Sequence, residues 1–200
     1  TPGVRALFVG ESGTGKTLAA SYIATALGSP LYRVDLSSVM NKYIGESEKN
    51  LSQLLDYAAV GDVVLLFDEA DSLFGSRSEG KETGERYANM LTNFLLTRIE
   101  NHPGMVILTT NGKERIDNAF NRPIDVEVDF PLPGYEERLS LWRSHLGEQQ
   151  AISQEAFGTI ASYCDFAGGQ VRNAVLAAAT YAESEQIGMH DLLRGIILEY

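Results

Sequence analysis

The fold of this chain is decided by one stretch near its start, Gly10-Glu11-Ser12-Gly13-Thr14-Gly15-Lys16-Thr17. The stretch matches the pattern G-x-x-x-x-G-K-[ST] at every fixed position. It follows an apolar run, Ala6–Val9, and precedes a helical pattern, Leu18–Leu27, so it joins a predicted strand to a predicted helix. Glycines in such a loop let backbone N–H groups turn inward around phosphates, and the helix N-terminus adds its positive end. The stretch therefore predicts an α/β fold with a phosphate-binding loop rather than a chance glycine-rich turn.

Two side chains at the end of this loop carry chemistry of their own. Lys16 can reach the β- and γ-phosphates of a nucleotide, and the hydroxyl of Thr17 can ligate magnesium. We therefore expect ATP and Mg²⁺ as cofactors. GTP is not expected, because Asn111-Gly112-Lys113-Glu114 does not fit the guanine signature Asn-Lys-x-Asp. The residues of this segment expected to contact the nucleotide are Gly10, Glu11, Ser12, Gly13, Thr14, Gly15, Lys16, Thr17 and Leu18.

A pair of carboxylates follows the longest apolar strand candidate. Val63–Phe67 has the composition of a strand buried on both faces, and Asp68 and Glu69 come directly after it. Asp68 is positioned to hold magnesium through water, and Glu69 to orient and polarise an attacking water. By themselves these acids also suit a solvated turn, but beside a complete phosphate loop they predict chemistry. Because a kinase need not carry the second acid, Glu69 favours hydrolysis over transfer to a metabolite.

Short apolar runs alternate with helical patterns up to about Pro133, and the remainder has helical patterns only. The alternation predicts a parallel sheet with helices on both faces, followed by a small helical bundle. We therefore expect a nucleotide-binding α/β subdomain at residues 1–133 and a helical subdomain at residues 134–200. Ser153 is expected to cap one of the later helices. The expected strands are Ala6–Val9, Leu31–Val34, Val63–Phe67, Met105–Leu108 and Val126–Phe130.

The composition of the chain argues against nucleic-acid binding and against a membrane-spanning protein. The 200 residues are 44% hydrophobic, which is enough for a full core, and the formal net charge is −11. An acidic surface repels phosphate backbones, so we expect no general nucleic-acid or anionic-membrane binding. The single cysteine, Cys164, is expected to be a small buried side chain in a reducing, cytoplasmic location. No apolar run approaches the length of about 20 residues that spans a membrane.

With its two motifs and the string Asp68-Glu69-Ala70-Asp71, the chain resembles the AAA+ superfamily of ATPases, and within it the AAA clade. The resemblance covers essentially the whole chain. It implies a P-loop NTPase fold, with a parallel sheet in the order 5-1-4-3-2 and a small C-terminal helical lid. It also implies a homo-oligomeric ring, a hexamer in most members, which acts on a polypeptide substrate.

Two further motifs take their roles from this resemblance. Met105–Asn111 resembles the strand that carries the first sensor, in which Asn111 would contact the γ-phosphate and the lytic water; by itself, Asn111 before Gly112 suits a turn. Tyr43-Ile44-Gly45 resembles the aromatic–hydrophobic–glycine pore loop that grips polypeptide in the central channel. An aromatic ring on a glycine-flexible loop can pack against almost any side chain, although Tyr43 could also pack under its own loop. Residues 74–84 match the second pore-facing loop by position only.

Two places depart from the clade's pattern. The stretch Ile116–Asp125 lies where the clade places two arginine fingers, which reach the γ-phosphate of the neighbouring subunit, but it retains only Arg122. Pro123-Ile124-Asp125 stands where Arg-Phe-Asp is common. In contrast, Gly168–Asn173 contains Arg172, at a position where other AAA+ branches carry a second sensor arginine in the lid. Arg172 fits that role, and it also fits an ordinary surface arginine early in a helix.

These features lead to one main expectation and two alternatives. We expect an ATP hydrolase that works as a ring and couples hydrolysis to protein unfolding, disassembly or remodelling. The altered finger motif also suits a nucleotide-dependent switch or scaffold with low turnover. A DNA-handling loader is disfavoured by the net charge of −11 and by the Tyr43 loop. Because the chain opens abruptly at Thr1-Pro2-Gly3, we expect both of its ends to be boundaries inside a longer protein.

Overall fold

The computed structural model of this chain describes residues 3–35, 46–70, 82–112, 124–148 and 150–200. Within them, five parallel strands form one sheet in the order β2-β3-β4-β1-β5. This is the order 5-1-4-3-2 read from the opposite edge, so the expected fold class is confirmed. The strands are β1 (Arg5–Val9), β2 (Leu31–Asp35), β3 (Val64–Asp68), β4 (Val106–Thr110) and β5 (Val126–Asp129).

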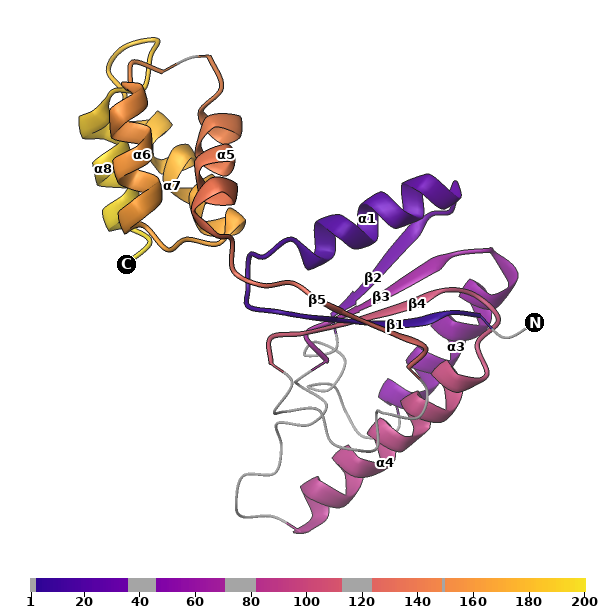
Figure 1. Ribbon diagram of the computed structural model, residues 1–200. Helices are drawn as coiled ribbons and strands as arrows, with labels where there is room; N and C mark the ends of the chain where they lie inside the picture. Colours follow the sequence, from indigo (N-terminus) through magenta and orange to yellow (C-terminus); the bar gives the residue numbers. More distant parts are fainter. Residues whose placement is uncertain (1–2, 36–45, 71–81, 113–123, 149) are drawn as a thin grey trace. The chain divides into compact units, whose positions relative to one another are not determined.

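Helices cover both faces of the sheet, as Figure 1 shows. Helix α1 (Lys16–Leu27) lies on one face, and α3 (Glu46–Val60) and α4 (Glu82–Glu100) lie on the other. The side chains of β3 alternate between the two faces, because successive residues of a strand point to opposite sides. Leu66 joins the apolar cluster on the α1 side, and Phe67 joins the cluster on the α3 and α4 side.

The strands extend further into polar sequence than the apolar runs predicted. β3 includes Asp68 as its last residue, and β4 continues past Leu108 through Thr109 and Thr110. The last two residues of β4 pair in register with the end of β1, and both are buried. The ladder is built from backbone groups, so it does not stop where the side chains become polar. The residues that carry the chemistry therefore lie at the carboxyl ends of the strands or directly after them.

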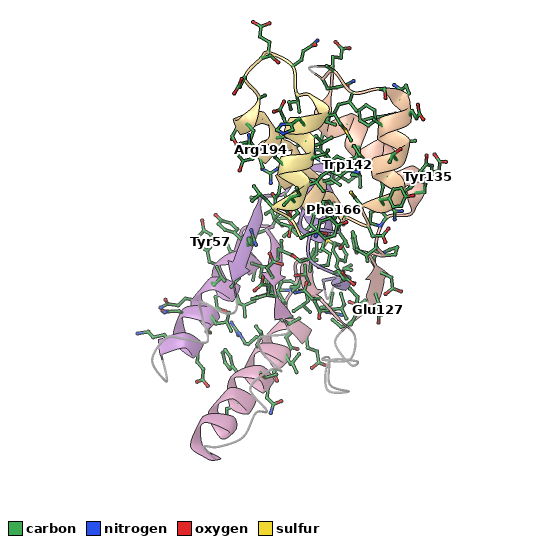
Figure 2. All side chains as sticks on the ribbon, turned by 90° about the vertical axis from the view of Figure 1, so that its left-hand side faces the viewer. Tyr57, Glu127, Tyr135, Trp142, Phe166 and Arg194 are labelled. Carbon is green, nitrogen blue, oxygen red and sulfur yellow. The ribbon has the colours of Figure 1, made fainter. Side chains whose placement is uncertain are left out.

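The C-terminal residues form four helices with a core of their own. They are α5 (Tyr135–Leu146), α6 (Gln154–Tyr163), α7 (Gly168–Tyr181) and α8 (Met189–Ile197). Trp142 is fully buried in this core and packs near Phe166, with ring centroids 6.2 Å apart; both are labelled in Figure 2. Ser153 caps α6 as predicted, since its hydroxyl accepts a hydrogen bond from the N–H of Ala156 at 3.2 Å. Cys164 is buried as expected, and burial raises the pKa of its thiol.

Contacts divide the chain into two compact units. The first comprises Thr1–Gly10 and Lys16–Phe130, and the second comprises Glu11–Gly15 and Pro131–Tyr200. Within the second unit, the N–H of Gly169 at the start of α7 donates to the carbonyl of Gly13 at 2.9 Å. Among the described residues, no helix is both long and apolar enough to cross a membrane.

Candidate functional site

The phosphate-loop sequence forms a tight turn between β1 and α1. β1 is buried along its whole length, and the N–H of Gly10 continues the ladder by donating to the carbonyl of Thr110 at 3.1 Å. Gly13 and Gly15 adopt φ values of +81° and +101°, a left-handed backbone conformation that favours glycine. Helix α1 begins at once with Lys16, so its unpaired N-terminal N–H groups lie at the end of the loop. Such an arrangement suits an anion, phosphate above all.

Lys16 is a buried cation that links two of the predicted site residues. Its side chain is 8% exposed, and its Nζ donates to the carbonyl of Gly10 at 2.5 Å. The same Nζ donates to Oδ1 of Asn111 at 3.3 Å. Asn111 directly follows β4, which lies beside β1 in the sheet. The topology thus brings together a lysine and an asparagine that are far apart in the sequence.

Asp68 ends β3 with both oxygens of its carboxylate engaged. Its Oδ1 accepts a hydrogen bond from the hydroxyl of Thr109 at 2.5 Å, and its Oδ2 lies 2.5 Å from Nη2 of Arg33. Thr109 comes from β4 and Arg33 from β2, the two strands that flank β3. The Asp68 side chain is only 10% exposed, so these contacts act on a largely desolvated charge. The carboxylate is therefore held in one orientation from both sides.

Glu69 follows Asp68 in a strained backbone conformation. Its φ is +56°, which is uncommon for a residue with a side chain. Its N–H donates to the hydroxyl of Thr109 at 3.1 Å. One threonine hydroxyl therefore contacts both members of the acidic pair, as donor to Asp68 and as acceptor from Glu69. Glu69 itself is exposed, so its carboxylate is accessible to water.

The donor set fits magnesium. Thr17, in the first turn of α1, offers a hydroxyl oxygen, and Asp68 offers a carboxylate oxygen; both are the hard ligands that Mg²⁺ prefers. In the described part of the chain, no cluster of three or more His, Cys, Asp or Glu side chains could hold a metal by itself. Mg²⁺ is usually bound by one or two protein groups together with substrate phosphates and water, so Thr17 and Asp68 are a sufficient protein contribution.

Two other predicted site residues are exposed, and others lie outside the described residues. Leu18 is 75% exposed on α1, and Arg172 is exposed on α7. The predicted pore loop Tyr43-Ile44-Gly45 and the finger candidate Arg122 lie outside the described residues. Their roles therefore stay predictions.

Sequence reasoning missed Arg33 and Thr109. Arg33 is a charged residue inside the strand candidate Leu31–Val34, and Thr109 directly follows the candidate Met105–Leu108. A polar residue in or beside a short apolar run was the available signal. Their importance depends on which strands are neighbours, because only the order β2-β3-β4 brings both to Asp68. A single strand read by itself does not reveal its partners.

Comparison with known proteins agrees with the fold. The model of the ATPase family associated with various cellular activities (AAA) matches residues 6–132. The chain is 28% identical to the 26S proteasome subunit RPT4 of Saccharomyces cerevisiae, over 95% of this chain and 46% of that protein. It is 30% identical to a vesicle-fusing ATPase of Arabidopsis thaliana, over 95% of this chain and 28% of the relative.

A shorter match and a solved structure complete the comparison. Vacuolar protein sorting-associated protein 4B of Mus musculus is 34% identical over 78% of this chain and 36% of its own length. The crystal structure of the FIGL-1 AAA domain superposes with a TM-score of 0.77 at 21% identity, over 99% of this chain and 72% of that one, and so shows the same fold. This chain spans less than half the length of each of the three curated relatives named here.

Proposed function

The chain belongs to the AAA family of ATPases, and we propose that it binds ATP with Mg²⁺ and hydrolyses the terminal phosphate. One observation carries this proposal. The adjacent strands β1, β4 and β3 bring four side chains to the carboxyl end of the sheet, those of Lys16, Asn111, Asp68 and Glu69. In open α/β sheets, ligands bind outside the carboxyl ends of the strands. Here that end holds a cation, an amide and two carboxylates beside a phosphate loop.

Each side chain has a distinct proposed task. Lys16 and the loop N–H groups bind the β- and γ-phosphates, and Thr17 and Asp68 hold Mg²⁺. The metal supplies charge neutralisation on the phosphate oxygens when bound. Glu69 orients a water and accepts its proton, and Asn111 positions the water against the phosphate. Arg172, one turn into α7, is proposed to reach phosphate from the helical residues 134–200, which act as the lid to the nucleotide-binding residues 1–133.

The binding step is tested by Lys16→Ala. This change removes the buried cation whose Nζ lies at the loop, so we expect affinity for a fluorescent ATP analogue to fall by at least about 100-fold, because charged contacts to phosphate are strong. Lys49→Ala is the matched control, since it removes the same charge from an exposed position on α3. Equal nucleotide affinity in Lys16→Ala and Lys49→Ala would contradict the assignment of the phosphate site.

We further propose that the protein works as a homo-oligomeric ring, a hexamer, on a polypeptide substrate in the cytoplasm. The support is the family membership and the pore-loop motif Tyr43-Ile44-Gly45. In such a ring Tyr43 grips the polypeptide, and Arg122 completes the site of the neighbouring subunit. Tyr43→Ala should impair substrate remodelling and leave basal hydrolysis near the parent rate; loss of ATP binding instead would contradict the pore role.

A low-turnover switch is the second candidate, and one observation favours it. Asp125, at the end of the altered finger stretch, forms an ion pair with Arg5 of β1. Nε of Arg5 lies 2.8 Å from Oδ2 of Asp125, and the backbone N–H of Arg5 donates to the same oxygen at 2.8 Å. These contacts, the backbone hydrogen bond first, hold the pKa of the Asp125 carboxyl below its ordinary value.

Mixed oligomers separate the motor from the switch. Arg122→Ala subunits and Glu69→Gln subunits should each be inactive alone, because one lacks the finger and the other lacks the base. When the two are mixed, some sites combine an intact Glu69 with an intact Arg122 of the neighbour, so hydrolysis should partly return. Inactive mixtures with proven co-assembly would contradict the finger role and favour the switch.

A further inference from the structure

Arg33 forms an ion pair that the phosphate-loop chemistry leaves unexplained. It lies on β2, in register with Leu66 of β3, and its guanidinium reaches along the sheet to Oδ2 of Asp68 at 2.5 Å. β2 is the strand at the edge of the described sheet. A positive side chain from the sheet edge therefore contacts the carboxylate that is proposed to hold the metal.

The two partners differ in burial. The Arg33 side chain is 61% exposed, whereas that of Asp68 is 10% exposed. An ion pair with one mostly exposed partner adds little to folding, because water screens it and the long side chain loses entropy. The carboxylate, in contrast, is shielded, so a nearby positive charge has its main effect on what else that carboxylate binds. The geometry therefore points to a role in ligand binding more than in stability.

The second contact of the Asp68 carboxylate, with Thr109, differs in charge from the contact with Arg33. Thr109 donates to the other oxygen of Asp68 from within the buried core of the sheet. The donor of that hydrogen bond is an uncharged hydroxyl. It fixes the orientation of the carboxylate, but it does not repel a bound cation. Arg33 places a full positive charge beside the other oxygen of the carboxylate.

We propose that Arg33 sets the concentration of divalent cation that nucleotide binding requires, because it shares the carboxylate of Asp68 with the metal. This inference rests on the proposed function. The guanidinium and a divalent cation are attracted to the same carboxylate and repel one another, so Arg33 lowers the affinity of the site for the cation. Removal of its charge should tighten cation binding roughly three- to tenfold, the scale of charge repulsion over several ångströms when water screens it, as it does for an arginine side chain that is 61% exposed.

The experiment measures Mn²⁺ binding to the chain saturated with ADP, by the loss of the electron paramagnetic resonance signal of free Mn²⁺. The dissociation constant for Mn²⁺ is compared among the parent, Arg33→Gln and Arg33→Lys. A matched control is Arg98→Gln, which removes the same charge from another partly exposed ion pair, that of Arg98 on α4 with Asp56 on α3. Thermal unfolding of each variant shows that it is folded.

We expect Arg33→Gln to bind Mn²⁺ about three- to tenfold more tightly than the parent, while Arg33→Lys and Arg98→Gln stay within about twofold. A dissociation constant for Arg33→Gln that equals or exceeds the parent's would overturn the role of Arg33. If that result is obtained and the parent chain still binds ADP in a Mn²⁺-dependent manner, only the role of Arg33 is overturned and the proposed function stands. A parent that binds no ADP contradicts the proposed function, and the role of Arg33 with it.

Discussion

The hydroxyl of Thr109 serves two neighbours at once. It donates to the carboxylate of Asp68 and accepts from the N–H of Glu69, and the residue is 1% exposed. Removal of this hydroxyl is costly, because the largely buried carboxylate of Asp68 then loses a hydrogen bond. Thr109 therefore positions the metal-holding acid and the residue proposed to activate water, although it contacts neither nucleotide nor metal in our account.

Thr109→Val tests this positioning role, since valine keeps the shape and loses the hydroxyl. We expect the turnover number for ATP to fall by about 10- to 100-fold, the scale of a lost hydrogen bond to a charged group, with a smaller change in KM. Thr109→Ser keeps the hydroxyl and should recover most of the rate. Steady-state hydrolysis with both variants checks this. Turnover in Thr109→Val that matches Thr109→Ser would show that the hydroxyl does not matter.

Among individual residues, the sequence predicted those that belong to contiguous motifs with a fixed spacing. Lys16, Thr17, Asp68 and Glu69 belong to contiguous motifs, and the structure places them at the ends of the predicted strands and helix. Arg33 was not predictable in the same way. Its contact with Asp68 depends on β2 lying beside β3 in a definite register, and that pairing is a property of the folded sheet.

At the scale of elements, the connection between α4 and β4 holds a buried histidine. His102 follows the last turn of α4, and its backbone carbonyl accepts from the N–H of Gly3 at 3.2 Å. The side chain is 3% exposed, and its Nε2 has no hydrogen-bond partner among the described residues. Burial lowers the pKa of His102 below the ordinary value of 6.5, and nearby Arg98 lowers it further.

This lowered pKa predicts how stability depends on pH. Below pH 6.5 the unfolded chain takes up a proton on His102 that the folded chain does not, so stability is lost as the pH falls from 6.5 toward the folded-state pKa. His102→Leu removes the titrating group and should flatten this loss between pH 7.5 and pH 5.5. Urea unfolding midpoints measure it, with the exposed His145→Leu as control. Equal pH slopes in His102→Leu and the parent would contradict this assignment.

The elements also show why some of their ends were predicted wrongly. The apolar pattern ended one strand at Leu108, but β4 continues to Thr110 because its backbone still pairs with β1. Likewise, the apolar pattern ended another strand at Phe67, but β3 includes Asp68. Apolar periodicity reports which faces are buried, whereas the end of an element depends on backbone hydrogen bonds that periodicity does not record.

On the scale of the whole molecule, each unit has its own apolar core. The sheet unit packs two clusters on its two faces, and the helical residues surround Trp142. Alternating apolar runs were sufficient to predict this layered class, whereas the strand order was implied by the resemblance to the AAA+ superfamily. The proposed ring, pore loop and arginine finger are different, because they concern contacts between subunits that one chain does not contain.

The central claim is that this chain hydrolyses ATP through Glu69, and Glu69→Gln tests it most directly. The amide cannot accept a proton from water, but it keeps the size of the side chain and leaves Lys16 in place. Parent and variant are compared in ATP affinity and in single-turnover hydrolysis, with Glu148→Gln, an exposed acid in the helical unit, as the matched control. We predict that Glu69→Gln binds ATP within about threefold of the parent and hydrolyses it at least about 100-fold more slowly. Hydrolysis at the parent rate by Glu69→Gln, with ATP binding intact, would contradict the claim.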